Sequence, residues 1–222
     1  MAMPLDALAA RRVYDRIGRL QDSQHVYEDI VTDRLTQGAD FGGCTSLFEL
    51  GCGTGRYAAQ LLESALPPTA SYLGVDVSSK MVALSRNRLA PWSDRARVVL
   101  LDPPALELPA NTGAFDRFVA AYVFDLLSPQ DGEALLGEAA RLLASGGLLG
   151  VVSLTKGTTI SSRIVSSGWE AIAKRWPSLL GGCQPIELRD LISGPEWAIE
   201  HCDVDVKFAV PSEVVIARRV GG

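Results

Sequence analysis

The stretch FELGCGTGRYAAQLL, residues 48–62, places three glycines within five positions, between an apolar run and a stretch with helical character. A strand that ends near Leu50 is followed by Gly51, Gly53 and Gly55 and then by a helix. Glycine has no Cβ, so it adopts backbone angles that other residues avoid and lets a ligand approach the backbone closely. In open α/β sheets, ligands bind beyond the carboxyl ends of the strands, and the free N–H groups at a helix start favour an electron-rich ligand group. The stretch therefore predicts a ligand-binding turn at the carboxyl edge of a sheet.

Outward from this turn, apolar runs alternate with helical stretches. The apolar runs are SLFEL (46–50), SYLGV (71–75), RVVLL (97–101), FDRFVAAYV (115–123) and GLLGVVSL (147–154), and the helical stretches are RYAAQLLESAL, SKMVALSRNRLA and QDGEALLGEAARLLA. Continuous apolarity is typical of strands that are buried on both faces of a parallel sheet. Strand and helix in turn predict an α/β fold with a Rossmann-like, doubly wound sheet.

The two ends of the chain depart from this alternation. Two N-terminal helical segments, at about 5–20 and 22–36, precede the first strand. Residues 203–220 (DVDVKFAVPSEVVIARRV) form two alternating runs joined by Val-Pro-Ser-Glu, which predicts an antiparallel hairpin. We therefore expect a mostly parallel sheet with an antiparallel C-terminal hairpin strand.

Length and composition favour one globular domain over residues 1–222, with 47% apolar residues. The formal net charge of −5 argues against a nucleic-acid partner. The four cysteines and two histidines show no metal-ligand spacing, so we expect no metal site and the reduced thiols of a cytoplasmic protein. The sequence shows neither an apolar run near the ~20 residues of a membrane span nor the apolar core of a signal peptide.

The first helical segment is basic on one side. It carries Arg11, Arg12, Arg16 and Arg19, and its apolar residues recur at helical spacing, which indicates an amphipathic helix. Two interpretations stay open. The helix either packs on the domain with a solvated basic face, or it makes a weak contact with an anionic membrane surface.

The position of the glycines separates two classes of cofactor. Dinucleotide-binding turns have the pattern G-x-G-x-x-G, whereas here the third glycine comes one position early and Arg56 stands where that pattern needs glycine. E-L-G-C-G-T-G instead resembles motif I of the class I S-adenosylmethionine-dependent methyltransferases. The resemblance implies that Glu49 lies near the methionine amino group of S-adenosylmethionine. It also implies that the turn of Gly51, Gly53 and Gly55 accommodates the methionine and ribose portions.

Four further stretches follow in the order found in that family. LGVDVSSKMV, VVLLDPPALELP, FDRFVAAYVFDLL and LLASGGLLGVV resemble the segments around its second to fifth strands. The resemblance implies that Asp76 accepts hydrogen bonds from the ribose hydroxyls, that Met81 lies beside adenine and that Asp102 receives the adenine amino group. Asp102 equally suits a turn former before two prolines, and Pro103 lacks the N–H that many relatives offer to the adenine ring.

Tyr122 and Asp125 are substrate-side candidates, because they follow the fourth strand where relatives carry polar or aromatic residues facing the methyl donor. Asp125 also suits a cap of the turn or helix after that strand. The resemblance implies no fixed catalytic base, since transfer from a sulfonium depends mainly on positioning. The catalytic residues are therefore left unassigned.

Two aromatic residues outside these motifs are further substrate-side candidates. Tyr14 belongs to an N-terminal helical lid, residues 1–40, where an aromatic residue closes over the cofactor in many relatives; simple packing is the alternative. Trp169 lies in residues 155–195, a common place for a substrate-shaping insertion. Its apolar stripe at helical spacing suits either a lid over a hydrophobic substrate or a core helix.

These resemblances together predict S-adenosylmethionine-dependent methyl transfer to a small-molecule acceptor through an O, N or C nucleophile, hydrophobic or lipid-like acceptors included. The motifs are similar to those of the ubiquinone/menaquinone-biosynthesis type of methyltransferase. Two alternatives stay open. One is an NAD-dependent oxidoreductase, which would have glycine at position 56, and the other is a non-catalytic domain that binds S-adenosylmethionine or a partner protein.

Overall fold

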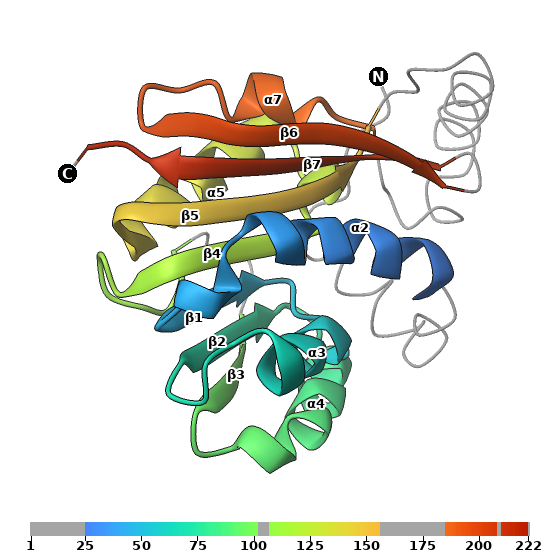
Figure 1. Cartoon of the computed structure of the whole chain (residues 1–222), viewed down its shortest axis with the longest axis vertical. Helices are drawn as coiled ribbons and strands as arrows, with labels where there is room; N and C mark the ends of the chain where they lie inside the picture. The colour runs from blue at the N-terminus through green and yellow to red at the C-terminus, as the bar shows by residue number, and fades with distance from the viewer. Residues whose placement is uncertain (1–24, 102–106, 156–184, 208–209, 222) are drawn as a thin grey trace.

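The computed structural model describes residues 25–101, 107–155, 185–207 and 210–221, and its strands form a seven-stranded sheet in the order β3-β2-β1-β4-β5-β7-β6 (Figure 1). The strands are β1 (Ser46–Leu50), β2 (Ser71–Asp76), β3 (Ala96–Leu100), β4 (Phe115–Ala121), β5 (Leu143–Leu154), β6 (Trp197–Lys207) and β7 (Val210–Arg219). The pairs from β3 to β5 are parallel, and β7 is antiparallel to both of its neighbours. The sheet confirms the predicted Rossmann-like fold with its antiparallel final strand.

Helices cover both faces of the sheet (Figure 1). One face carries α2 (His25–Gly38), α3 (Arg56–Ser64) and α4 (Ser79–Arg88), and the other carries α5 (Pro129–Leu142) and α7 (Leu188–Leu191). The connections in the described part of the chain contain the short 3₁₀ turns η2 (Phe41–Gly43), η3 (Ala90–Trp92) and η4 (Phe124–Leu126). Because both faces are covered, the inner strands are apolar along nearly their whole length.

Aromatic residues fill the core on the α5 side. The ring of Phe48 stacks on Phe118 with centroids 5.1 Å apart and meets Phe115 edge-on at 5.3 Å. Leu135 and Leu136 of α5 belong to the same buried cluster. The helix itself begins at Ser128, whose hydroxyl accepts the amide of Asp131, with Pro129 at its first position.

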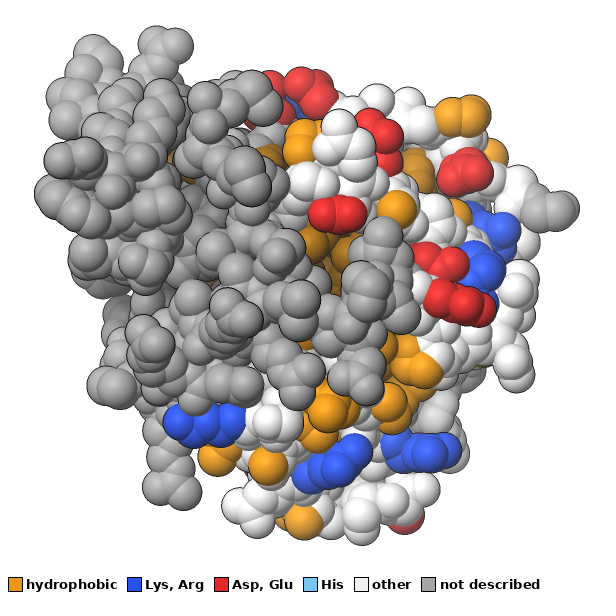
Figure 2. Space-filling model, turned by 180° about the vertical axis from the view of Figure 1, so that it is seen from behind, with side chains coloured by type: hydrophobic (Ala, Val, Ile, Leu, Met, Phe, Trp, Pro, Cys, Tyr) orange, Lys and Arg blue, Asp and Glu red, His pale blue; other side chains and the backbone are white. Residues whose placement is uncertain are grey.

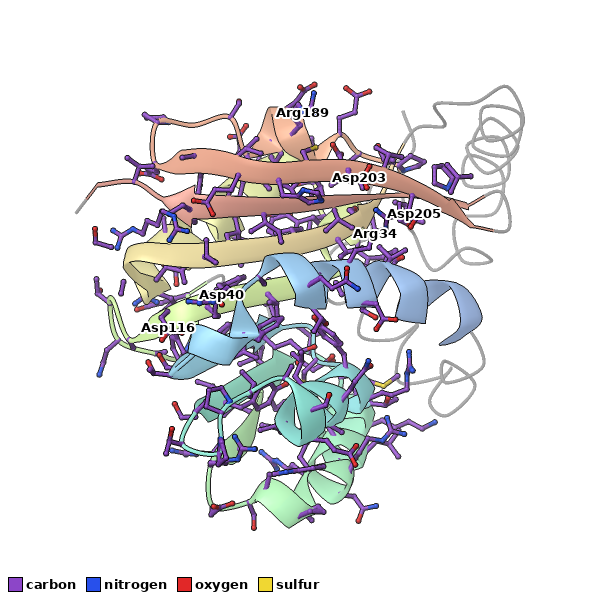
Figure 3. The ribbon with its side chains drawn as sticks, in the orientation of Figure 1. Arg34, Asp40, Asp116, Arg189, Asp203 and Asp205 are labelled. Carbon is purple, nitrogen blue, oxygen red and sulfur yellow. The ribbon has the colours of Figure 1, made fainter. Side chains whose placement is uncertain are left out.

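Two arginines connect α2 and the residues after it to the sheet. Arg34 reaches Asp203 at 2.6 Å and Asp205 at 2.9 Å, which ties α2 to β6 (Figure 3). After α2, the buried guanidinium of Arg117 donates to the carbonyl oxygens of Ala39 and Asp40, each at 2.7 Å. The segment that precedes β1 is therefore held at both the β6 edge and the middle of the sheet.

The sequence predicted most element positions, and several boundaries differ, among them the start of β6 at Trp197 instead of 203. The helix expected at 22–36 is present as α2, whereas 5–20 lies outside the described residues. Val-Pro-Ser-Glu (210–213) was wrongly expected to be the hairpin turn: it lies within β7, with Lys207 opposite Val210 and Val206 opposite Pro211. The carbonyl of Pro211 accepts a hydrogen bond from the amide of Thr155, so β7 pairs with its neighbour despite the proline. Pro211 is also the second residue of β7, and proline is tolerated near the start of a strand.

β5 also begins earlier than expected, at Leu143 instead of 147. Gly146 has a φ of 78°, and the pairing of β4 with β5 changes register between Phe115 and Arg117. A glycine-containing irregularity thus extends the strand beyond its apolar run.

No helix in the described part of the chain is long and apolar enough to cross a membrane.

Candidate functional site

The glycine turn lies where the order of the strands reverses. β1 stands between β2 and β4, and the turn follows its carboxyl end. The amides of Gly51 and Cys52 both donate to the carbonyl of Val75 on β2, at 2.8 and 3.0 Å, and the amide of Gly55 donates to the carbonyl of Cys52 at 2.9 Å. This reversal point is where ligands bind in open α/β sheets.

All three glycines have backbone angles in the left-handed region, with φ values of 71° at Gly51, 53° at Gly53 and 75° at Gly55. Two of them also make close packing possible. A Cβ at Gly51 would lie 2.5 Å from Cγ2 of Val123, and one at Gly55 would lie 2.5 Å from Oγ of Ser85. A Cβ at Gly53, by contrast, would meet no described atom within 4 Å. Among the described residues, the turn therefore leaves room beside Gly53 for another group to come close to the backbone.

Asp76 ends β2 beside this turn. Its Oδ2 accepts the amide of Gly53 at 2.9 Å, and its Oδ1 accepts the amide of Ser78 at 2.8 Å. Ser78 in turn caps α4, because its hydroxyl accepts the amide of Met81 at 3.2 Å. The carboxylate is buried and oriented from two sides, and an ionised carboxylate can accept several hydrogen bonds at once.

Glu49 lies one residue before the end of β1 and is 3% exposed. The hydroxyl of Tyr72 donates to its Oε2 at 2.6 Å. Burial raises the pKa of Glu49 to about 7; the Tyr72 hydrogen bond works against this rise, and the nearby charge of Asp76 adds to it. A cation placed beside this carboxylate would favour its ionised form.

Arg88, at the end of α4, connects this helix to the glycine turn. Its Nη1 donates to the carbonyl of Thr54 at 3.1 Å and to the hydroxyl of Thr54 at 2.7 Å. Thr54 sits between Gly53 and Gly55, so this contact fixes the turn at its centre. The turn is thus held by β2 on one side and by α4 on the other.

Tyr122 follows β4 at the same edge of the sheet and has an unusual backbone for a tyrosine, with a φ of 56°. Its amide donates to the carbonyl of Val152 at 2.8 Å, and its hydroxyl lies 3.1 Å from Oγ of Ser212 on β7. Left-handed backbone in a bulky residue costs free energy and is frequent at functional sites. Asp125 follows in η4 and is 1% exposed.

The structure brings the predicted residues of the first two motifs together, namely Glu49, the glycine turn and Asp76. Met81 lies in the first turn of α4 and is fully buried, at 1% exposed. Asp102, Tyr14 and Trp169 lie outside the described residues. In the described part of the chain, no cluster of three or more His, Cys, Asp or Glu side chains is arranged to hold a metal ion.

Three residues of the site were not predicted from the sequence, namely Tyr72, Ser78 and Arg88. Ser78 could have been found as a helix start signal, because serine before a helical run is a common cap. Tyr72 and Arg88 gave no such signal: each acts on a residue of another element, and no pattern within one strand or helix reveals the pairing.

Known proteins share this architecture. A family described as methyltransferase domain matches residues 47–147. The demethylmenaquinone methyltransferase of Thermus thermophilus is 37% identical over 106 residues, which cover 48% of this chain and 46% of that protein. The chain thus spans less than half the length of this relative.

Two solved structures have the same fold. The [4+2]-cyclase SpnF matches 100% of this chain and 98% of its own at 18% identity, with a TM-score of 0.70. Magnesium protoporphyrin IX methyltransferase (ChlM) from Synechocystis PCC 6803, solved with bound S-adenosylhomocysteine, matches 87% of this chain and 83% of its own at 15% identity, with a TM-score of 0.64. Residues 47–147 therefore resemble the methyltransferase domain family, and the described sheet has the fold of these two solved proteins.

Proposed function

We propose that this chain transfers a methyl group from S-adenosylmethionine to a small-molecule acceptor. The observation that carries the proposal is the hydrogen bond from the amide of Gly53 to Asp76, at 2.9 Å, beside the buried carboxylate of Glu49. The bond joins the glycine turn to the Asp76 carboxylate, and Glu49 adds a second carboxylate at the carboxyl edge of the sheet. The match of residues 47–147 to methyltransferase domains supports the same conclusion.

The donor set fits the chemistry of this cofactor. Glu49 is suited to its ammonium group, because a buried carboxylate gains strongly from a partner cation. Asp76 is suited to the two ribose hydroxyls, because an oriented carboxylate accepts two donors. A Cβ at Gly53 would meet no described atom within 4 Å, which suits the close approach of the methionine and ribose portions. We propose Met81 and Asp102 as the adenine side of the site, on the family resemblance of their motifs.

When bound, S-adenosylmethionine supplies a methyl group on a positively charged sulfur, which is already activated for in-line displacement. The chain's own residues then have to orient the acceptor and exclude water. Tyr122, held by Ser212, and Asp125 follow β4 and are our candidates for facing the acceptor. Tyr14 and Trp169 are proposed to close the site, within an N-terminal lid (1–40) and an insertion (155–195) of a single domain.

The acceptor that we propose is hydrophobic and not a nucleic acid. The Thermus relative is named for demethylmenaquinone, so a quinone-like acceptor is the first to assay. In Figure 2 the described surface carries acidic side chains next to basic and apolar ones, and the net charge is −5. A weak membrane contact by residues 5–20 and a cytoplasmic location stay predictions.

The fold also occurs in a protein described as a [4+2]-cyclase, so cofactor binding has to be separated from transfer. The test is to incubate the protein with methyl-labelled S-adenosylmethionine and demethylmenaquinone-like acceptors. We expect S-adenosylhomocysteine and a labelled product in equal amounts, and neither with Asp76→Ala. Binding of the cofactor without either product would favour the non-catalytic alternative for these acceptors.

A further inference from the structure

Tyr72 reaches Glu49 diagonally across two parallel strands. In the pairing of β1 with β2, Leu47 is opposite Tyr72 and Glu49 is opposite Gly74. The Tyr72 ring therefore has to extend over Gly74 before its hydroxyl can donate to Oε2 of Glu49, at 2.6 Å. Both partners are buried, Tyr72 at 2% and Glu49 at 3% exposed.

Gly74 makes this reach possible. A Cβ at position 74 would fall against the Tyr72 hydroxyl, 2.9 Å from Cζ of the same ring and 3.0 Å from Cβ of Cys52. Those distances are below ordinary van der Waals contact, so any larger residue would displace the ring. The missing side chain at Gly74 thus leaves the space that the tyrosine hydroxyl occupies.

We propose that Tyr72 is a positioning residue for cofactor binding: its hydroxyl, lying over Gly74, orients the Glu49 carboxylate toward the ammonium group of S-adenosylmethionine. This inference rests on the proposed function. A hydrogen bond to an ionised acceptor is stronger than one to a neutral acceptor. Tyr72 therefore favours the carboxylate form of Glu49, which is the form that attracts an ammonium group.

The titratable groups that face Glu49 come from three elements. Tyr72 and Asp76 belong to β2, Cys52 to the glycine turn and Tyr57 to α3. Burial raises the pKa values of Tyr72, Cys52 and Tyr57 well above their ordinary values, so all three stay neutral near pH 7. The Tyr72 hydrogen bond lowers the pKa of Glu49 against the effect of burial, and its removal raises that pKa further.

Calorimetric titration between pH 6 and 8.5 tests the inference with two ligands and three proteins. S-adenosylhomocysteine carries the ammonium group, whereas 5′-methylthioadenosine has the same nucleoside without the amino acid. Tyr72→Phe removes the hydroxyl alone. Tyr57→Phe is the matched control, because the Tyr57 hydroxyl pairs with Thr36 at 3.0 Å and not with Glu49. Titration in buffers of different ionisation enthalpy counts the protons released on binding.

We expect wild-type protein to release close to one proton on binding S-adenosylhomocysteine at pH 6, and fewer as the pH rises through 7. In Tyr72→Phe this release persists to higher pH, and the affinity at pH 7 falls roughly tenfold. The affinity for 5′-methylthioadenosine stays the same in both proteins. Tyr57→Phe behaves like wild type with both ligands.

Two results would overturn the inference. In the first, wild type binds S-adenosylhomocysteine and Tyr72→Phe binds it with the same affinity and the same proton release. In the second, Tyr72→Phe loses both ligands equally, which would make Tyr72 a general packing residue. If wild type binds neither ligand, the proposed function itself fails, and this outcome is distinct from the other two.

Discussion

The amide of Gly53 donates a 2.9 Å hydrogen bond to Oδ2 of Asp76. This bond makes the turn after β1 and the carboxylate at the end of β2 one structural unit. Any change at one of the two partners therefore alters the position of the other. The site is assembled by the parallel pairing of β1 with β2 and not by either strand alone.

We expect Gly55 to be important for packing and Gly53 to be important for ligand binding. Gly55→Ala combines a left-handed backbone with a Cβ that meets Ser85 at 2.5 Å, and we expect a loss of roughly 2 to 4 kcal/mol in the free energy of unfolding. In Gly53→Ala the new methyl meets no atom of the described residues within 4 Å, so we expect a loss of only about 1 kcal/mol. Denaturant unfolding measures both.

Gly53→Ala, which is expected to cost little stability, should have a large effect on the binding of S-adenosylhomocysteine. Gly53→Ala places its methyl group where the ligand approaches, and we expect the affinity to fall at least about tenfold in a protein that stays folded. Normal affinity in Gly53→Ala would show that this side of the turn does not face the ligand.

Arg88 should matter for the cofactor through Thr54. Arg88→Ala removes the two hydrogen bonds that hold the turn at its centre, and we expect a three- to tenfold weaker affinity for S-adenosylhomocysteine, at about 1 kcal/mol of lost contact energy. Arg86→Ala is the control, because Arg86 donates to the carbonyl of Val98, away from the turn. Equal effects of the two variants on affinity would refute a specific role of Arg88.

Glu49 should make the stability of the ligand-free protein depend on pH. Its pKa is raised from 4.5 to about 7 by burial. The unfolded chain therefore loses this proton at lower pH than the folded chain does. The stabilisation is full below pH 4.5 and is lost as the pH rises to about 7, by about 3 kcal/mol in total.

The variant Glu49→Gln keeps an acceptor for Tyr72 and cannot titrate. Chemical denaturation should show that wild type loses unfolding free energy relative to Glu49→Gln as the pH rises from 4.5 to 7. The contributions of the other titrating groups cancel in this difference. A difference that stays constant over this range would mean that Glu49 has the same pKa in the folded and the unfolded protein.

The sequence was most informative where an element is buried on both faces. β1 has the predicted limits, Ser46 to Leu50, because continuous apolarity and the following glycine define both ends. The structure places Glu49 and Asp76 beside the glycine turn, because the carboxyl ends of adjacent parallel strands meet at one edge, and their roles toward a cofactor stay predictions.

The sequence was least informative where the local structure depends on contacts between elements that are distant in the chain. Val-Pro-Ser-Glu has the composition of a turn, yet pairing with β5 and β6 places it in β7. The hydroxyl of Tyr72 finds Glu49 only through the strand register and the space above Gly74. Likewise, the residue type of Tyr122 does not predict its left-handed backbone or its contacts with Val152 and Ser212, which lie on other strands.

The most direct test of the account is a calorimetric titration of the purified protein with S-adenosylmethionine, S-adenosylhomocysteine and NAD, with Asp76→Ala beside wild type. We predict micromolar binding of both sulfur-containing ligands, a loss of at least about a hundredfold in Asp76→Ala and no binding of NAD. Binding of NAD alone, or sulfur-ligand affinity that is unchanged in Asp76→Ala, would contradict the account.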